Sequence, residues 1–137
     1  MVAALAGVGV GLNREWKRKP LGMRTLALVA LGSAIAPLAA LHFHDLGSSS
    51  PQAIARVVQG ILEGVLTGIG FIGAGAVLRD PRHETVEGLT TAATVWVTAA
   101  VGLACALADW TVVAGGVGLT LAVLFGIGWL ETRLTAD

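Results

Sequence analysis

Charge and cysteine are both scarce in this chain of 137 residues. Charged residues make up 13% of the sequence, hydrophobic residues make up 55%, and the mean hydropathy of +0.78 lies beyond that of ordinary soluble domains. The single cysteine, Cys105, excludes an intramolecular disulfide and has no neighbour at a metal-ligand spacing. No basic tail indicates binding to nucleic acid. These features predict one polytopic membrane domain over residues 1–137, in contact with membrane lipid.

The motifs that identify common enzyme classes are missing as well. The chain has no P-loop lysine and no serine nucleophile elbow. The glycines of GIGFIGAG, residues 68–75, lack the strand and the acidic partner of a dinucleotide-binding fingerprint. The first positive charge, Arg14, follows the amino-terminal apolar run, which is not the order of a cleaved signal peptide. We therefore expect a protein that is not an enzyme, needs no cofactor and keeps its amino terminus in the membrane.

Five apolar stretches dominate the sequence. Residues 1–12 would form a helix of only ~18 Å, short of the ~30 Å hydrocarbon core of a bilayer. The other stretches approach or exceed the length of a membrane span and cover residues 25–41, 56–78, 88–108 and 111–130. The sequence therefore predicts an all-α fold, a polytopic membrane helix bundle of about five transmembrane helices with a short first helix.

Positive charges are distributed unequally over the segments that connect these stretches. If the five spans alternate across a membrane, eight of the nine lysines and arginines fall on one side and Arg56 falls on the other. Cytoplasmic segments of membrane proteins carry the excess of lysine and arginine. We therefore expect the amino terminus outside and the carboxyl terminus in the cytoplasm.

The third span, residues 56–78, is unusually rich in glycine. Gly60, Gly64 and Gly68 recur at every fourth position, so they share one helix face on which another backbone can approach closely. Further glycines follow towards the end of the span, and from these we predict close packing of residues 68–78 against the first and fourth spans.

A polar line runs beside the glycine face of the third span and consists of Arg56, Gln59, Glu63 and Thr67. An ionisable group at the depth of Glu63 usually faces protein or water. Two interpretations stay open. Gln59, Glu63 and Thr67 form an ion or proton site, or the carboxylate reaches the membrane surface or bonds to a neighbouring helix. We favour the second, structural interpretation.

Other polar side chains also have structural interpretations that we favour over functional ones. The first group, which we place in a loop at the membrane surface because its spacing is not specific for a metal, is His42, His44 and Asp45. The second group lies in the fourth span and consists of Thr90, Thr91 and Thr94. Hydroxyls in membrane helices commonly bond to a carbonyl four residues earlier or to a neighbouring helix.

Three blocks of the sequence, taken together and in order, resemble a known family. They are GLNREWKRKPLGMRT at residues 11–25, RVVQG with TGIGFIGAGAVL at residues 56–60 and 67–78, and VEGLTTAATVWVTAAVGLA at residues 86–104. The chain is similar in these blocks to the MgtC/SapB family of bacterial inner-membrane proteins. The motif positions that carry over are Arg14, Glu15, Arg24, Thr25, Gly68, Gly70, Gly73, Gly75, Gly88, Thr90, Thr91 and Trp96.

The chain departs from the family pattern at two places. Many members have histidine after the Arg-Thr pair of the first loop, where this chain has Leu26. The residues around Glu63 look like a one-turn extension between blocks that are usually closer together. Several members also append a soluble domain, which we do not expect in a chain that ends at Asp137.

The resemblance implies a multi-pass protein of the bacterial inner membrane with a role in magnesium-limited growth and, in pathogens, in virulence. Members look like modulators of partner membrane proteins, including the ATP synthase and transport ATPases. An oligomer, with a homodimer favoured, is compatible with the small-residue faces. The alternative is a transporter or channel for magnesium or another ion, with a polar path near Glu63 and Thr90, and the sequence leaves open whether a metal binds.

A charged network at the cytoplasmic end is a further hypothesis. Arg14, Glu15, Arg24 and Glu87 all fall on the same predicted side of the membrane. Arg14 with Glu87, or Glu15 with Arg24, would be the natural ion pairs. The same residues could equally be solvated loop charges, because surface ion pairs contribute little to stability.

Overall fold

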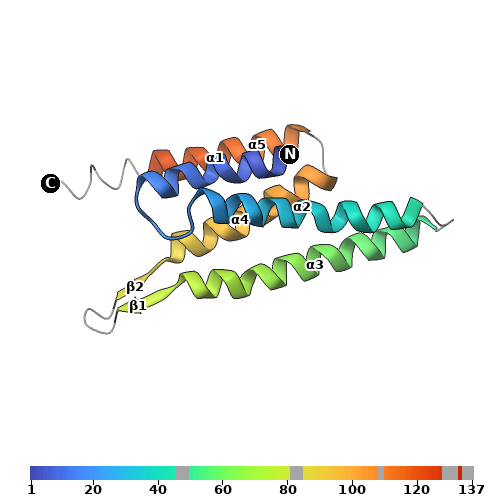
Figure 1. The fold of residues 1–137 in the computed structure, drawn as a ribbon, viewed down its shortest axis with the longest axis horizontal. Helices are drawn as coiled ribbons and strands as arrows, with labels where there is room; N and C mark the ends of the chain where they lie inside the picture. Colours follow the sequence, from blue (N-terminus) through green and yellow to red (C-terminus); the bar gives the residue numbers. More distant parts are fainter. Residues whose placement is uncertain (46–49, 81–84, 108–109, 128–132, 134–137) are drawn as a thin grey trace.

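The fold is seen in a computed structural model that describes residues 1–45, 50–80, 85–107, 110–127 and 133 (Figure 1). The helices are α1 (Val2–Trp16), α2 (Met23–Asp45), α3 (Pro51–Ala76), α4 (Leu89–Leu107) and α5 (Trp110–Ala122). The last of these continues as a short π-helix, η1 (Val123–Ile127), and two short strands, β1 (Leu78–Asp80) and β2 (Thr85–Glu87), join α3 to α4.

The predicted helical membrane bundle is confirmed. Within the described residues, four helical segments are long and apolar enough to cross a membrane, namely α2, α3, α4 and α5 with η1. The remaining helix, α1, has 15 residues and is therefore about 22 Å long, as the shortness of the first apolar stretch predicts. The strands β1 and β2, which the sequence analysis does not predict, pair antiparallel.

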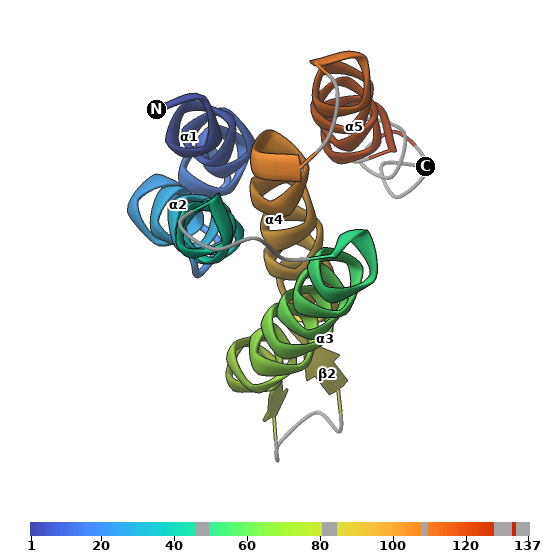
Figure 2. The ribbon, with the colours of Figure 1, turned by 90° about the vertical axis from the view of Figure 1, so that its right-hand side faces the viewer.

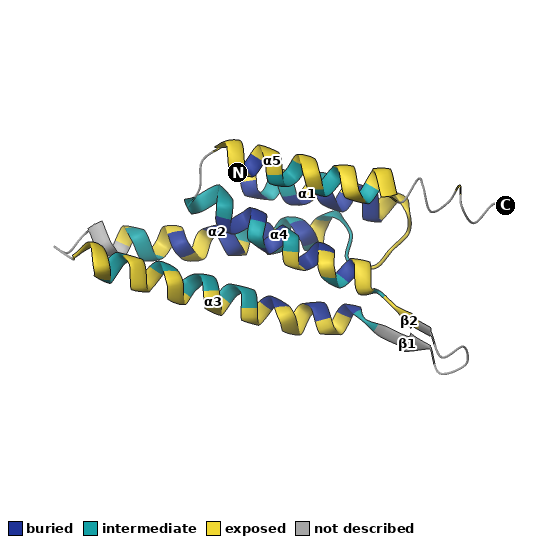
Figure 3. Cartoon of the chain, turned by 180° about the vertical axis from the view of Figure 1, so that it is seen from behind, coloured by how far each residue is buried: buried dark blue, intermediate teal, exposed yellow. Residues whose placement is uncertain are grey.

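Helix α4 lies at the centre of the bundle and packs against α1, α2, α3 and α5 (Figure 2). Its buried residues include Val95 and Ala99, which form the core with Val10 of α1, Leu26 of α2 and Ile69 of α3. Figure 3 shows that exposed positions run along α3 and α5, whereas buried positions gather on α4. The central helix is thus shielded, and the two helices beside it present broad outer faces.

Glycines let the neighbours of α2 approach its backbone. A Cβ atom at Gly7 of α1 would lie 2.5 Å from the carbonyl oxygen of Leu26, and one at Gly102 of α4 would lie 2.3 Å from that of Ala30. No carbon atom fits at such distances, so these glycines set the separation of the helices. Gly7 and Gly11 stand four positions apart, a spacing of small residues that is typical of helix packing. The role of Gly102 was not predicted.

The packing predicted for residues 68–78 against the fourth span is confirmed, whereas their predicted packing against the first span is wrong. In α3, a Cβ at Gly73 would make an ordinary contact, 3.7 Å from the Cβ of Ala92. Gly68, Gly70 and Gly75 have no described atom within 4 Å of such a Cβ. They face away from α4 because the helix turns its heavier side chains, such as buried Ile69, towards the core. The principal neighbours of α3 are α4 and α2 rather than the first span.

Two helix boundaries differ from the prediction. The segment with His42, which was predicted as loop, forms the last turns of α2, since the helix continues to Asp45. Helix α3 begins earlier than predicted because the side chain of Ser50 accepts a hydrogen bond from the Ala53 amide at 3.4 Å, with Pro51 in the first turn. His42 itself is exposed, and the side chains of His44 and Asp45 lie outside what the structure describes.

Basic residues gather at one end of the bundle. Figure 1 shows the loop between α1 and α2 at the same end as the strands β1 and β2. Lys17 to Lys19 belong to that loop, Arg24 to the first turn of α2 and Arg79 to β1, whereas Arg56 lies near the beginning of α3 at the opposite end. The predicted segregation of charge therefore holds for these residues, while Arg82 lies outside the described part of the chain. We call this end the basic end.

Candidate functional site

Two polar side chains are buried where α1 ends. Asn13 is 2% exposed and Arg14 is 4% exposed, although both stand in the last turn of the helix. The turn closes tightly, because the Lys19 amide donates to the carbonyl of Arg14 at 3.0 Å. The chain thus folds back over the end of α1 and positions the Arg14 guanidinium against α4.

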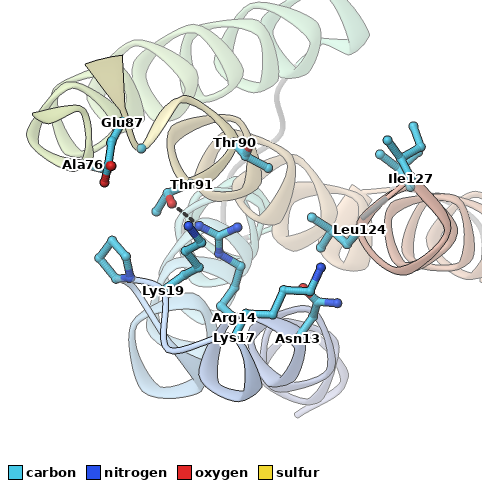
Figure 4. A pocket seen from close by; sticks show the side chains of 13 residues that line it. Asn13, Arg14, Lys17, Lys19, Ala76, Glu87, Thr90, Thr91, Leu124 and Ile127 are labelled. Atoms are coloured by element: carbon cyan, nitrogen blue, oxygen red, sulfur yellow. Dashed lines mark hydrogen bonds between the residues drawn. The ribbon is translucent and has the colours of Figure 1, made fainter. Parts of the chain in front are cut away.

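The guanidinium of Arg14 donates a hydrogen bond to the hydroxyl of Thr91 in the first turn of α4 (Figure 4). Both side chains are buried, and 77 positions separate them in the sequence. Two of the family-motif blocks meet through this bond. It joins α1 to α4 directly at the basic end.

A cavity of about 490 Å³ opens beside this bond. Figure 4 shows the side chains around it, which come from α1, the loop after it, the end of α3, the end of β2, the start of α4 and η1. The lining residues are Asn13, Arg14, Lys17, Lys19, Pro20, Ala76, Glu87, Gly88, Thr90, Thr91, Val123, Leu124 and Ile127. We call this space the basic-end cavity.

The predicted ion pairs are not the contacts that form. Arg14 and Glu87 line the same cavity, but the guanidinium bonds to Thr91 instead. Glu15 turns to the start of α2, where its Oε2 accepts a hydrogen bond from the Met23 amide at 3.3 Å. Arg24 is exposed and does not line the cavity. The start of α2 offers an amide that has no acceptor within the helix, together with a partial positive charge. It therefore competes with the flexible side chain of Arg24 for the Glu15 carboxylate.

Removing the Glu15 carboxylate should therefore destabilise α2. We expect Glu15→Ala to lower the free energy of unfolding by about 1 kcal/mol, as for the loss of a helix cap. Glu15→Gln keeps an oxygen acceptor without the charge and should lose less than half of that amount. Thermal unfolding followed by circular dichroism in detergent measures both. Equal losses in the two variants would contradict the capping role.

Gly88 is required by the geometry at the start of α4. Its φ of +89° lies in the region that favours glycine, and a Cβ there would lie 2.0 Å from the carbonyl oxygen of Ala76. This tight reversal sets the first turn of α4 directly beside the end of α3. Thr91 is thereby brought to Arg14, which gives this motif glycine a structural reason.

Thr91 and Thr94 of α4 make the kinds of hydrogen bond that were predicted for them. The Thr94 hydroxyl donates to the carbonyl of Thr90 at 2.7 Å, and the Thr98 hydroxyl donates to that of Thr94 at 2.7 Å. Thr91 instead bonds across to a neighbouring helix. Thr90 is exposed at the cavity. Thr94 and Thr98 thus satisfy their hydroxyls within the helix, and no second function is needed to explain them.

The residues of the polar line of α3 do not line the basic-end cavity. The Gln59 amide donates to Glu63 Oε1 at 2.8 Å, and both residues are exposed, as is Thr67. These side chains therefore lie together on the outer surface of α3. In the described part of the chain, no cluster of three or more histidine, cysteine, aspartate or glutamate residues could hold a metal ion.

The remaining motif residues are placed at the periphery. Thr25 is half-buried in α2 next to the fully buried Leu26, which stands where many family members have histidine. Trp96 is exposed on α4. The sequence reasoning missed the roles of Asn13, Lys17 and Lys19 in lining the cavity. Their membership in one dense basic block with Arg14 is the signal that could have indicated them.

Comparisons with known proteins extend over almost the whole chain. A sequence profile of the MgtC family matches residues 1–133. Protein SrpB of Synechococcus elongatus is 39% identical over an alignment of 144 positions, which covers 96% of this chain and 77% of SrpB. Protein MgtC of Salmonella typhimurium is 36% identical over 110 residues, which cover 80% of this chain and 42% of that protein.

A further relative is YhiD of Escherichia coli, whose name proposes magnesium transport. It is 36% identical over 135 residues, which cover 98% of this chain and 61% of YhiD. The chain thus spans less than two thirds of MgtC and of YhiD. No solved structure is similar to it at a significant level.

Proposed function

The chain belongs to the MgtC family of membrane proteins, and on this premise we propose that it modulates partner membrane proteins of the bacterial inner membrane through helix contacts. The setting is adaptation to magnesium limitation. Transport ATPases and the ATP synthase are the partner classes, and a second copy of the chain is a further one. The chain acts without catalysis.

The outer face of α3 is the single observation that carries this proposal. At Gly60, Gly64 and Gly68, no described atom lies within 4 Å of where a Cβ would be. A membrane gives little hydrophobic drive to helix association, so close packing over small residues and interhelical hydrogen bonds supply it. The face is thus suited to a helix from another chain.

The polar residues beside this face support the same proposal. Glu63 is exposed on a helix that is long and apolar enough to span a membrane. A carboxylate facing lipid is costly, and a hydrogen bond from Gln59 satisfies only part of it. A partner helix that carries donors at this depth would cover Glu63.

The proposed orientation places the basic end in the cytoplasm. The basic loop after α1 and the strand β1 lie together at that end, and cytoplasmic segments carry the excess of lysine and arginine. The amino terminus is then outside. Partners would contact α3 within the membrane, and the basic-end cavity would open towards the cytoplasm.

A substitution that fills the glycine face tests the proposal. We expect Gly64→Leu to weaken association with the partner or with a second copy at least tenfold, because the side chain prevents close approach of another backbone. Gly32→Leu is the matched control, since Gly32 of α2 is also open and exposed but belongs to no such face. Cross-linking in native membranes, followed by purification, measures association. Wild-type association of Gly64→Leu would contradict the proposal.

A flux assay distinguishes magnesium transport, the alternative function, from modulation of a partner protein. Purified protein in liposomes with a magnesium-sensitive dye inside should give no flux above that of empty liposomes if the chain is a modulator. A specific flux that Glu63→Ala abolishes would instead favour transport. Fluorescence of the enclosed dye against time is the measurement.

A further inference from the structure

The basic-end cavity contains hydrogen-bond donors that no acceptor satisfies. Within the described part of the chain, Asn13 Nδ2 and Arg14 Nε have no hydrogen-bond partner, although both atoms are buried. Buried polar groups in folded proteins are nearly always bonded to protein, water or a ligand. Both side chains line the cavity. A hydrogen-bond acceptor that enters the cavity would therefore satisfy these two donors.

The charge of the lining favours an anion as that acceptor. Arg14, Lys17 and Lys19 contribute three positive charges, and Glu87 contributes one negative charge, so the lining has a formal charge of +2. Figure 4 shows Glu87 beside Ala76, with the bond between Arg14 and Thr91 separating it from Asn13. A bare cation would meet repulsion at most of this surface, whereas an anion would be attracted.

The start of α4 also favours an anion as the ligand of this cavity. Gly88, Thr90 and Thr91 line the cavity at the amino end of this 19-residue helix. The first amides of a helix have no acceptor within it, and the helix dipole places partial positive charge there. Helix starts of this kind bind phosphate and other anions. The residues of α1 with orphaned donors and the first residues of α4 thus line one space.

The opposite wall is apolar and comes from η1, the π-helix that follows α5. Val123 and Ile127 are the ends of the π-helix η1, and Leu124 lies between them. Short π-helical segments are frequent at functional sites. A volume of about 490 Å³ has room for more than a small inorganic ion. The wall suits an anion that is attached to an organic group.

We propose that the basic-end cavity binds a phosphate group, either that of a free phosphate compound or that of a membrane lipid headgroup. A tetrahedral phosphate offers several acceptor oxygens, which matches the number of donors better than a carboxylate does. This site is separate from the contact face of α3. An anion bound in this cavity would contact residues where α1, α4 and η1 meet.

The test uses the full chain purified in dodecyl maltoside, a detergent without phosphate. Inorganic phosphate is titrated by calorimetry, and dioleoylphosphatidylglycerol, delivered in the same detergent, is titrated by native mass spectrometry. Lys19→Gln removes an exposed charge from the lining. Arg18→Gln is the matched control, because Arg18 is an exposed neighbour that does not line the cavity. Thermal unfolding confirms that both variants fold.

The expected result is saturable binding of at least one probe, about tenfold weaker in Lys19→Gln and within twofold of wild type in Arg18→Gln. Binding of inorganic phosphate identifies a free phosphate site, and binding of the lipid alone identifies a headgroup site. Either outcome supports the proposal. Two results would overturn it: no saturable binding of either probe, or equal weakening in both variants.

Discussion

Replacement of Gly102 by alanine is expected to lower the free energy of unfolding by about 3 kcal/mol. The new Cβ would lie 2.3 Å from the carbonyl oxygen of Ala30 and 2.9 Å from the Cβ of Ser33. The nearest atom belongs to the backbone of α2, which cannot rotate away as a flexible side chain could. Relief therefore requires that α2 and α4 separate, and overpacking of this kind costs about 1–3 kcal/mol. Chemical unfolding in mixed micelles, followed by circular dichroism, measures the loss.

Gly32→Ala provides the matched control within the same helix pair. Gly32 of α2 is exposed, and no described atom lies within 4 Å of a Cβ placed there. Alanine favours helix over glycine by about 0.8–1 kcal/mol, so this variant should be slightly more stable than wild type. The two identical substitutions should thus shift stability in opposite directions. If both raised it, the close contact between α2 and α4 would be disproved.

Replacement of Thr91 by valine should cost about 2 kcal/mol. Valine has nearly the shape of threonine but removes the hydroxyl that accepts the hydrogen bond of Arg14. Because Arg14 is 4% exposed, its guanidinium would lose a partner in a buried position. Leaving a buried donor unsatisfied costs about 1–3 kcal/mol, with larger values for charged groups. The midpoint of thermal unfolding in detergent is the measurement.

Thr98→Val separates the cross-helix bond from the mere presence of a buried hydroxyl. Thr98 is 0% exposed, and its hydroxyl donates to the Thr94 carbonyl of its own helix. That carbonyl also takes part in the helix backbone, so valine should change stability by less than 1 kcal/mol. A loss at Thr98 as large as the loss at Thr91 would show that Arg14 gains little from its partner.

The predictions for Thr91 and Glu15 concern one structural junction. Gly88 brings the start of α4 to the end of α3, Thr91 bonds to Arg14, and Glu15 caps the next helix. The three contacts fix the loop after α1, whose lysines line the basic-end cavity. A ligand in that cavity would therefore bear on the same residues that hold α1, α2 and α4 together.

The sequence by itself determined the class of the protein and the approximate positions of its helices. Apolar length predicts the spans, the shortness of residues 1–12 predicts the short α1, and the basic block predicts a charged end. The family likewise follows from ordered motifs. These properties depend on composition and on spacing along one chain segment, which the sequence records directly.

Only the tertiary structure decided which motif residues meet. The sequence could not show that Arg14 bonds to Thr91 rather than to Glu87, or that Gly102, and not Gly68, sets a helix separation. Spacing places residues on a helix face, but it does not give the rotation of that helix against its neighbours. That rotation results from the packing of side chains over the whole bundle, and it turns Gly68, Gly70 and Gly75 of α3 outward.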